Sequence, residues 1–326
     1  MTLELFLRLL ALFIVGGIGF AAARAGLTGG AAGLRALSSL AFLVFVPALL
    51  FRSMARVDLA HLPASLLLAF FGPLLLWSLL ARAWFARRGP RLDPAEPAVR
   101  AVTASFGNTV QVGLPFAAAL FGEAGLQLHI AIVSLHALVL LSAQTVLAEI
   151  DLAHAAARAA GAARPPLGPV LRAIVRQSLI HPVTLPVLAG LGWNLVGMPL
   201  PALAEEVTTM LAQAGVPLCL VLIGVSLAEH GLGARWQVPL GIALAKLLLL
   251  PALVALGGVL VFRLDGLALS VLVMAAALPV GSNAMLFAQR YRVREGEAAA
   301  AVVISTVGFM LTAPLWLALL GAAAAG

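Results

Sequence analysis

The sequence predicts an all-α integral membrane protein with ten transmembrane helices, arranged as two inverted repeats of five helices. The first observation is composition. The 326 residues are 63% hydrophobic and 10% charged, with a mean hydropathy of +1.10, which an ordinary soluble protein does not reach. The second is a series of ten apolar runs, each near the ~20 residues that a helix needs to cross hydrocarbon. The third is that one run in each half carries the same kind of interruption.

The expected spans have ends uncertain by a few residues, and the fourth and ninth are the interrupted ones. The N-terminal run is expected to be the first membrane helix, because Glu4 and Arg8 lie where a signal peptide would be basic and then purely apolar. The ten spans cover 4–23, 34–54, 62–85, 98–121, 126–148, 170–196, 203–228, 237–262, 266–289 and 298–320.

The distribution of arginine predicts the orientation, because cytoplasmic loops of membrane proteins carry an excess of basic residues. The odd-numbered connections and adjoining helix ends hold 15 basic residues, from Arg24 to Arg294, whereas the opposite side holds Arg52, Arg56 and Arg263. Arg8 and Lys246 lie within spans. We therefore expect a multi-pass protein of the inner membrane with both termini on the outer, periplasmic side.

The sequence is expected to divide into a first five-helix repeat (1–148), a cytoplasmic linker (149–169) rich in Ala, Arg and Pro, and a second repeat (170–326). Pro47 and Pro217 lie 170 positions apart, as do Phe121 and Tyr291. An odd number of spans per repeat places the second copy in the membrane upside down relative to the first.

The interruptions of spans four and nine combine proline, glycine and uncharged polar residues. Proline removes a backbone donor and frees a carbonyl one turn earlier, and such groups survive in a membrane only inside protein or beside a wet cavity. Interrupted spans at matching positions of two halves are a sequence indication of a transporter's substrate site. Half-helices are expected to start near Phe116 and Val280. The polar residues and prolines concerned are Asn108, Thr109, Gln111 and Pro115 in the first span, and Pro279, Ser282 and Asn283 in the second.

Each candidate binding residue also has a purely structural interpretation. Asn108 and Asn283 could close the breaks by hydrogen bonding to freed backbone groups instead of binding substrate. Lys246, the single lysine, could reach the cytoplasmic surface along its helix, or could be a buried cation that helps to hold an anion. His129 and His136 lie on one helical face, where packing is the commoner role and a proton relay the alternative. Ser305 and Asn194 are expected to form interhelical hydrogen bonds.

Several classes of function find no support in the sequence. No Walker-type phosphate loop, His-Glu-x-x-His or Gly-x-Ser-x-Gly pattern is present, so we expect neither direct ATP hydrolysis nor an enzyme. With one cysteine, Cys219, the chain offers no intrachain disulfide and no thiolate metal cluster. The net charge of +7 is explained by loop arginines, so a nucleic-acid partner is not expected.

Four stretches resemble the auxin efflux carrier family, whose bacterial members include malonate and other organic-acid permeases. They are FGNTVQVGLPF (106–116), HPVTLPVLAGLGWNLVGMPLP (181–201), AGVPLCLVLIGVSL (214–227) and ALPVGSNAMLFAQRY (277–291). The resemblance implies a fold like that of sodium/proton antiporters, with spans four and nine crossing at Pro115 and Pro279. It also implies a scaffold part and a transport part that move relative to each other. Thr109-Val110-Gln111 departs from the family pattern, which usually has a small residue soon after the asparagine.

The function expected from these features is alternating-access transport of a small organic anion, auxin-like or a dicarboxylate such as malonate or malate. Its candidate ligands are Asn108, Thr109, Gln111, Ser282, Asn283 and Lys246. No cofactor or metal is expected; proton coupling, sodium coupling and uniport all remain open, as does a homodimer. The alternatives are a sodium-coupled organic-anion symporter of the bile-acid type and a membrane receptor without transport activity.

Overall fold

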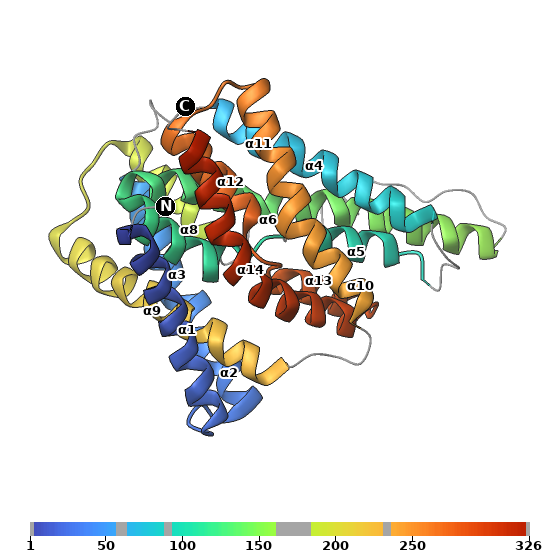
Figure 1. Ribbon diagram of the computed structural model, residues 1–326, viewed down its shortest axis with the longest axis horizontal. Coiled ribbons are helices and arrows are strands. Elements are labelled where there is room, and N and C mark those ends of the chain that lie inside the picture. The colour runs from blue at the N-terminus through green and yellow to red at the C-terminus, as the bar shows by residue number, and fades with distance from the viewer. Residues whose placement is uncertain (1–2, 57–63, 88–92, 161–183, 231–235, 324–326) are drawn as a thin grey trace.

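The computed structural model describes residues 3–56, 64–87, 93–160, 184–230 and 236–323 (Figure 1). The described residues of the first half of the chain fold into helices. Two of its helices continue through π-helical turns, η1 and η3, which widen the helix locally. The elements are α1 (Leu3–Arg24), α2 (Gly30–Leu40), η1 (Ala41–Phe45), α3 (Val46–Ala55), α4 (Ala64–Arg87), α5 (Glu96–Ser105), η3 (Thr109–Gly113) and α6 (Leu114–Ala160).

The second half is helical in the same way and contains one further π-helical turn, η4. The elements are α8 (Thr184–Val196), α9 (Ala202–His230), α10 (Gln237–Leu244), η4 (Ala245–Leu249), α11 (Leu250–Leu260), α12 (Gly266–Ala277), α13 (Ser282–Tyr291) and α14 (Glu295–Ala323). The C-terminal part of the expected sixth span is α8; residues 170–183 lie outside the described ranges.

Six helical stretches of the described chain are long and apolar enough to cross a membrane, and α12 and the second part of α1 are shorter apolar helices. One of the six, Thr109–Ala156, runs across Gly122, where φ is 65° and ψ is −161°. That backbone conformation is essentially restricted to glycine and turns the chain between the expected spans four and five. The structure therefore supports an all-helical integral membrane protein, whereas the number of ten spans stays a prediction.

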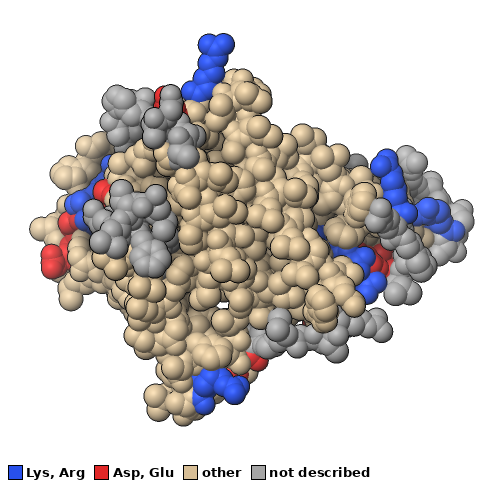
Figure 2. Space-filling model, viewed as in Figure 1, with Lys and Arg blue, Asp and Glu red and all other residues tan. Residues whose placement is uncertain are grey.

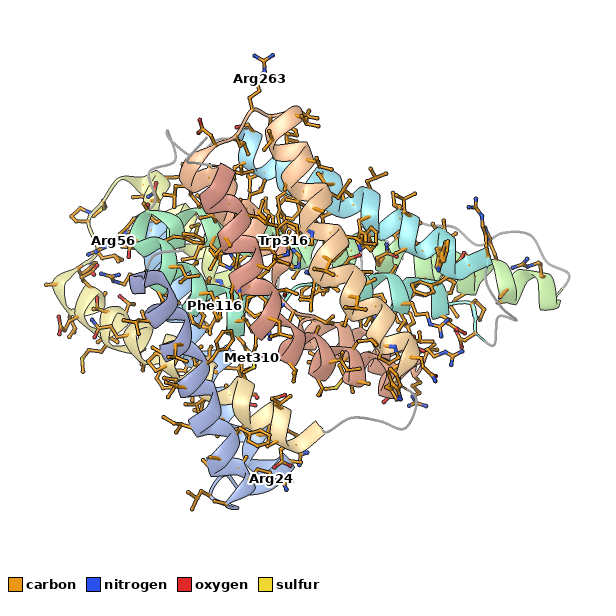
Figure 3. The ribbon with its side chains drawn as sticks, in the orientation of Figure 1. Arg24, Arg56, Phe116, Arg263, Met310 and Trp316 are labelled. Atoms are coloured by element: carbon orange, nitrogen blue, oxygen red, sulfur yellow. The ribbon has the colours of Figure 1, made fainter. Side chains whose placement is uncertain are left out.

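Large apolar side chains cover much of the surface, as expected for helices that face lipid. Leu203, Leu260 and Leu311 are each exposed by more than 70%. In the face shown in Figure 2, the charged residues gather at the extremities and leave a broad uncharged area between them. Arg24, Arg56 and Arg263 lie at separate points of this periphery (Figure 3). A soluble protein would not expose so much contiguous apolar surface.

The helices pack as two groups, visible in Figure 1. The first group is α1, α2, η1, α3, α8 and α9, in which α1 packs most extensively on α9 and α3 on α8. The second group is α4, α5, η3, α6 and α10 to α14, in which α4 packs on α5 and α11 on α12. Each half of the chain contributes its early helices to the first group and its later helices to the second.

Close packing of α1 on α9 depends on glycine. A Cβ atom at Gly19 would collide with the backbone of Val221, and one at Gly224 would collide with the carbonyl oxygen of Gly16. Small residues let membrane helices approach closely, where there is no hydrophobic driving force to hold them together. These glycines therefore give the first group a tightly fitted helix pair.

Residues 149–160, expected to begin the linker, instead continue α6 as helix; residues 161–169 lie outside the described ranges. Asp151 forms an ion pair with Arg82 of α4, and the Tyr291 hydroxyl donates a hydrogen bond to Glu149 at 3.0 Å. These contacts hold the end of α6 against α4 and α13.

Candidate functional site

The breaks in the two interrupted helices lie side by side and are hydrogen-bonded to each other. Residues 106–108 separate α5 from η3, and residues 278–281 separate α12 from α13. The N–H of Asn108 donates to the Pro279 carbonyl at 2.8 Å, and the N–H of Gly281 donates to the Phe106 carbonyl at 2.9 Å. The two extended segments thus form a short antiparallel bridge centred on Gly107 and Val280. We call the segments 106–108 and 278–281 the paired breaks.

The first break lies earlier in the chain than its proline predicted. The helix resumes at Thr109, capped by Asn108, so the expected start near Phe116 was wrong by about two turns. Pro115 instead lies in the first turn of α6, two residues after η3 ends, just as Pro47 follows η1 and Pro251 follows η4. A widened π turn before each proline relieves the clash of its ring with the preceding turn. Pro279, in contrast, lies within the second break, and α13 begins at Ser282.

Carbonyl oxygens that lose their helical partners at the breaks accept hydrogen bonds from side chains of neighbouring helices. The ammonium nitrogen of Lys246 donates to Ala276 O at 2.6 Å and to Leu278 O at 2.7 Å. The indole N–H of Trp77 donates to Ala104 O at 2.8 Å. A buried, unpaired carbonyl in a membrane interior would cost several kcal/mol, so these donors stabilise the breaks.

Backbone N–H groups at the breaks are satisfied in the same way. The N–H of Gly107 donates to Nε2 of His136 at 3.2 Å, and the N–H of Val280 donates to the Ser305 hydroxyl at 2.9 Å. Because His136 Nε2 accepts, the proton of the ring must lie on Nδ1, which has no hydrogen-bond partner among the described atoms. His136 also packs at 4.5 Å, centroid to centroid, against the ring of Phe106.

The polar side chains predicted at the first break hold the break itself. The Asn108 side-chain oxygen accepts from the N–H of Gln111, and its amide nitrogen donates to the Gln111 side-chain oxygen, both at 3.2 Å. The carbonyl of Thr109 accepts from Nε2 of His129 at 2.9 Å. The structural interpretation of Asn108, in which it closes the break, is therefore the one that the geometry shows directly.

The residues predicted at the second break are arranged differently. Asn283 is half-buried in the first turn of α13, and its side chain makes no hydrogen bond to another described side chain or backbone group. Ser282 begins α13, and its side chain lies outside what the structure describes. Asn283 is therefore the predicted ligand whose amide remains available.

Lys246 does not extend toward the cytoplasmic surface, so that interpretation was wrong. Its side chain is 1% exposed and ends on the C-terminal carbonyls of α12. Lys246 lies in η4, which is held in place by Trp316 (labelled in Figure 3). The indole N–H of Trp316 donates to Leu247 O at 2.9 Å. Pro251, which has no N–H, leaves this carbonyl without its helical partner. Sequence reasoning identified Lys246 as a candidate and did not predict its partners.

Among the described residues, five at or beside the breaks were not predicted as ligands: Trp77, His129, His136, Ser305 and Trp316. The expected interhelical hydrogen bond of Ser305 is confirmed, as is that of Asn194, which donates to Ala55 O at 3.0 Å. The two tryptophans could have been suspected, because a buried indole N–H usually finds an acceptor. Their acceptors could not have been predicted from spacing along the chain.

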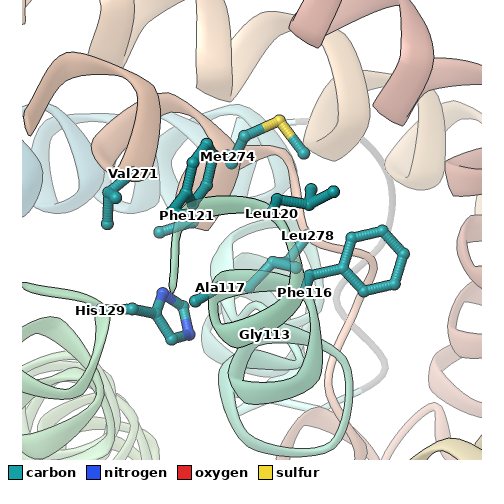
Figure 4. A pocket seen from close by; sticks show the side chains of 10 residues that line it. Gly113, Phe116, Ala117, Leu120, Phe121, His129, Val271, Met274 and Leu278 are labelled. Atoms are coloured by element: carbon teal, nitrogen blue, oxygen red, sulfur yellow. The ribbon is translucent and has the colours of Figure 1, made fainter. Parts of the chain in front are cut away.

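A small pocket lies beside the first break, lined by Gly113, Phe116, Ala117, His129 and Leu278 among others (Figure 4). Its volume of about 10 Å³ is near the lower limit for one water molecule. Apart from the ring nitrogens of His129 its lining side chains are apolar. In this arrangement of the helices the pocket is too small for a substrate.

Helices broken in their interior, paired with each other and capped by buried side chains, define a membrane protein of the transporter class. Residues 5–317 match the family described as membrane transport proteins, and the chain belongs to this family, as its resemblance to auxin efflux carriers predicted. The members of this family are transporters and not enzymes, so the expectation that the chain is no enzyme is confirmed.

Three relatives illustrate the range of the family. "Uncharacterized transporter YfdV" of Escherichia coli (strain K12) is 25% identical over 285 residues, 87% of each chain. "Putative malonate transporter" of Rhizobium meliloti (strain 1021) is 31% identical over 161 residues, 49% of this chain and 50% of that protein. "Auxin efflux carrier component 3a" of Oryza sativa subsp. japonica is 28% identical over 182 residues, 52% of this chain and 29% of that protein.

Proposed function

We propose that the protein is a secondary transporter or uniporter that moves a small organic anion across the inner membrane by alternating access. In this proposal ten transmembrane helices form two inverted five-helix repeats, and the fourth and ninth cross at the paired breaks. The arginine distribution supports periplasmic termini. The observation that carries the proposal is the pairing of two broken helices, one from each half of the chain, through their own backbone groups.

The charge around the paired breaks suits an anion. The N-terminal ends of η3 and α13 both begin at the breaks, and helix N-termini carry partial positive charge. Lys246 is a basic residue nearby, and neither 97–122 nor 266–294 contains an acidic residue. A carboxylate brought to this region would meet no opposing carboxylate from either broken helix.

The proposed substrate contact is Asn283, supported by Gln111 and the backbone at the start of α13. Asn108 and Thr109 would act indirectly, by keeping the first break in its shape, because the Asn108 side chain and the Thr109 carbonyl are already hydrogen-bonded there. The relatives named for malonate and auxin support a carboxylate-bearing substrate of small size. Movement of the first helix group against the second would open the breaks to either side in turn.

The test is uptake of labelled malonate, malate and indole-3-acetate into proteoliposomes. We expect at least one acid to be taken up, and Asn283→Ala to lower uptake about tenfold or more, because a hydrogen bond to a charged group contributes roughly 1.5–3 kcal/mol. The matched control is Ser270→Ala on α12 of the same broken helix, whose hydroxyl bonds only to Gly266 O within its own helix. Ser270→Ala should transport normally.

Two results would contradict the proposal. If Asn283→Ala transports as well as Ser270→Ala, the substrate does not contact Asn283. If no small organic acid is taken up by folded wild-type protein, either the substrate belongs to another class or the protein is a receptor that binds without transport.

A further inference from the structure

The nitrogen at the buried end of Lys246 is hydrogen-bonded to two main-chain carbonyl oxygens. This nitrogen lies 2.6 Å from Ala276 O and 2.7 Å from Leu278 O, and the side chain is 1% exposed. Both acceptors are main-chain carbonyls at the point where α12 unwinds. No acidic residue occurs in the chain between Glu229 and Asp265 or between Asp265 and Glu295, so carbonyl oxygens are the negative partners that these segments supply.

These carbonyls are available because the helix stops. The N–H that would bond to Ala276 O in a continuous helix belongs to Val280, and that group donates to Ser305 instead. The C-terminal end of a helix also carries partial negative charge, which favours a cation there. In transporters with broken helices, unwound carbonyls and half-helix C-termini of this kind coordinate the coupling sodium ion or proton.

We propose that the ammonium group of Lys246 takes the place of a coupling metal cation at the carbonyl end of α12, so that the transporter works without sodium. The amino group of Lys246 is tethered to the chain, whereas a free ion would have to be bound from solution and desolvated on each cycle. The inference concerns ion coupling and in that respect rests on the proposed function, but its test needs no substrate.

The surrounding structure holds the ammonium group in place. Lys246 lies in η4, whose widened backbone precedes Pro251, and Trp316 fixes η4 through Leu247 O at 2.9 Å. The Gly107 segment of the other break lies beside the ammonium group, where a Cβ atom placed on Gly107 would make an ordinary van der Waals contact with the Lys246 nitrogen at 3.6 Å. One cation therefore stabilises the end of α12 while lying against the partner break.

The experiment measures thermal unfolding of the purified full-length protein in detergent, in chloride salts of sodium, ammonium or N-methyl-D-glucamine at equal ionic strength. Wild type should unfold at the same temperature in all three salts. In N-methyl-D-glucamine the Tm of Lys246→Ala should be at least about 4 °C lower than that of wild type, because two buried carbonyls lose their donor. Sodium or ammonium ions, which are small enough to enter the vacated position, should raise the Tm of this variant but not that of wild type.

The matched control is Trp316→Phe. It removes the donor to Leu247 O, a carbonyl in the π-helical turn that carries Lys246, and it removes no charge. This variant should also lose stability, but its Tm should be the same in the three salts. A general loss of packing would move Tm in both variants and would produce no preference for a cation.

Two outcomes would overturn the inference. If the Tm of wild type rises specifically in sodium, a separate sodium site exists and Lys246 does not replace it. If Lys246→Ala unfolds at the same temperature in all three salts, the carbonyls do not form a cation site. Should Lys246→Ala fail to fold, the comparison of the wild type in the three salts still tests the inference, because a sodium-specific rise in its Tm would overturn it. Absence of malonate uptake would contradict the proposed substrate and leave these results unchanged.

Discussion

At the scale of single residues, this protein uses side chains to complete the hydrogen bonding of backbone groups at and beside its helix breaks. Lys246, His129 and Trp77 supply donors, while His136 and Ser305 supply acceptors. Water cannot perform this task in a membrane interior, so each replacement must come from a neighbouring helix. The side chains closest to the breaks are consequently structural, and Asn283 is the predicted ligand left with a free amide.

Gly113 shows how little room this arrangement leaves. A Cβ atom there would collide with Nε2 of His129, which donates to Thr109 O. We therefore expect Gly113→Ala to destabilise the protein by about 1–3 kcal/mol through overpacking, and to abolish transport by disturbing the first break. Thermal unfolding and malonate uptake of the purified variant would measure both effects.

Gly241→Ala is the matched control, because a Cβ atom at this helical position meets nothing within 4 Å. It should stabilise the helix by about 0.5–1 kcal/mol and leave transport unchanged. Equal behaviour of the two variants would show that His129 is free to move and does not support the break.

At the scale of helices, a network of charged residues joins α5 to α14. Arg100 forms two hydrogen bonds with Glu297, at 2.6 and 2.8 Å, and an ion pair with Glu96 at 2.9 Å. Glu96 also accepts from Arg294 at 2.8 Å. These side chains are largely buried, so the network connects the start of one broken helix to the helix that follows the other.

We expect Arg100→Gln to destabilise the protein by about 3 kcal/mol, because Glu297 would remain buried without its partner. A double-mutant cycle with Glu297→Gln, measured by chemical or thermal unfolding, should give a coupling energy of about 1–3 kcal/mol. Arg56→Gln is the control: Arg56 is half exposed and pairs with Glu205, which Arg52 also holds, so the change should cost less than about 1 kcal/mol. Additive effects of the Arg100 and Glu297 changes would mean that the pair contributes nothing of its own.

The lengths of the apolar runs predicted where helices lie. They did not predict whether a helix breaks or widens at its proline. The turn at Gly122 and the ends of α9 and α14 lie within a few residues of the expected span boundaries. The start of the half-helix after the first break was misplaced because Pro115 is accommodated by the widened turn of η3. A proline shows that the helix must change nearby, and whether it breaks or widens depends on partners from other helices.

At the scale of the whole molecule, the two helix groups meet through apolar contacts that movement would have to change. Phe13 of α1 contacts Phe116 of α6 across the groups, with ring centroids 5.8 Å apart. Phe116 also contacts Phe309 of α14 within the second group, at 4.9 Å. Because Phe116 takes part in both contacts, a contact between the two groups can be compared with a contact inside one group.

We expect a cross-link between Phe13→Cys and Phe116→Cys to block transport by fixing the groups together. A cross-link between Phe116→Cys and Phe309→Cys should leave much of the transport intact, because both residues lie in the second group. Both pairs would be made in a Cys219→Ala background and measured by malonate uptake before and after treatment with a short bismaleimide. Equal inhibition by the two cross-links would show that the groups do not move as bodies.

The sequence by itself determined the membrane location, the positions of the helices and the two interruptions, because these depend on local composition and on the thickness of a bilayer. It also singled out Lys246 as a residue that needs a role. Only the tertiary structure decided that the interruptions pair with each other, that Asn108 closes its own break, and that Lys246 ends on the carbonyls of α12. Those partners lie far apart in the sequence; Asn108 and Pro279, for example, are 171 positions apart. Whether they meet depends on how the helices pack rather than on any local pattern.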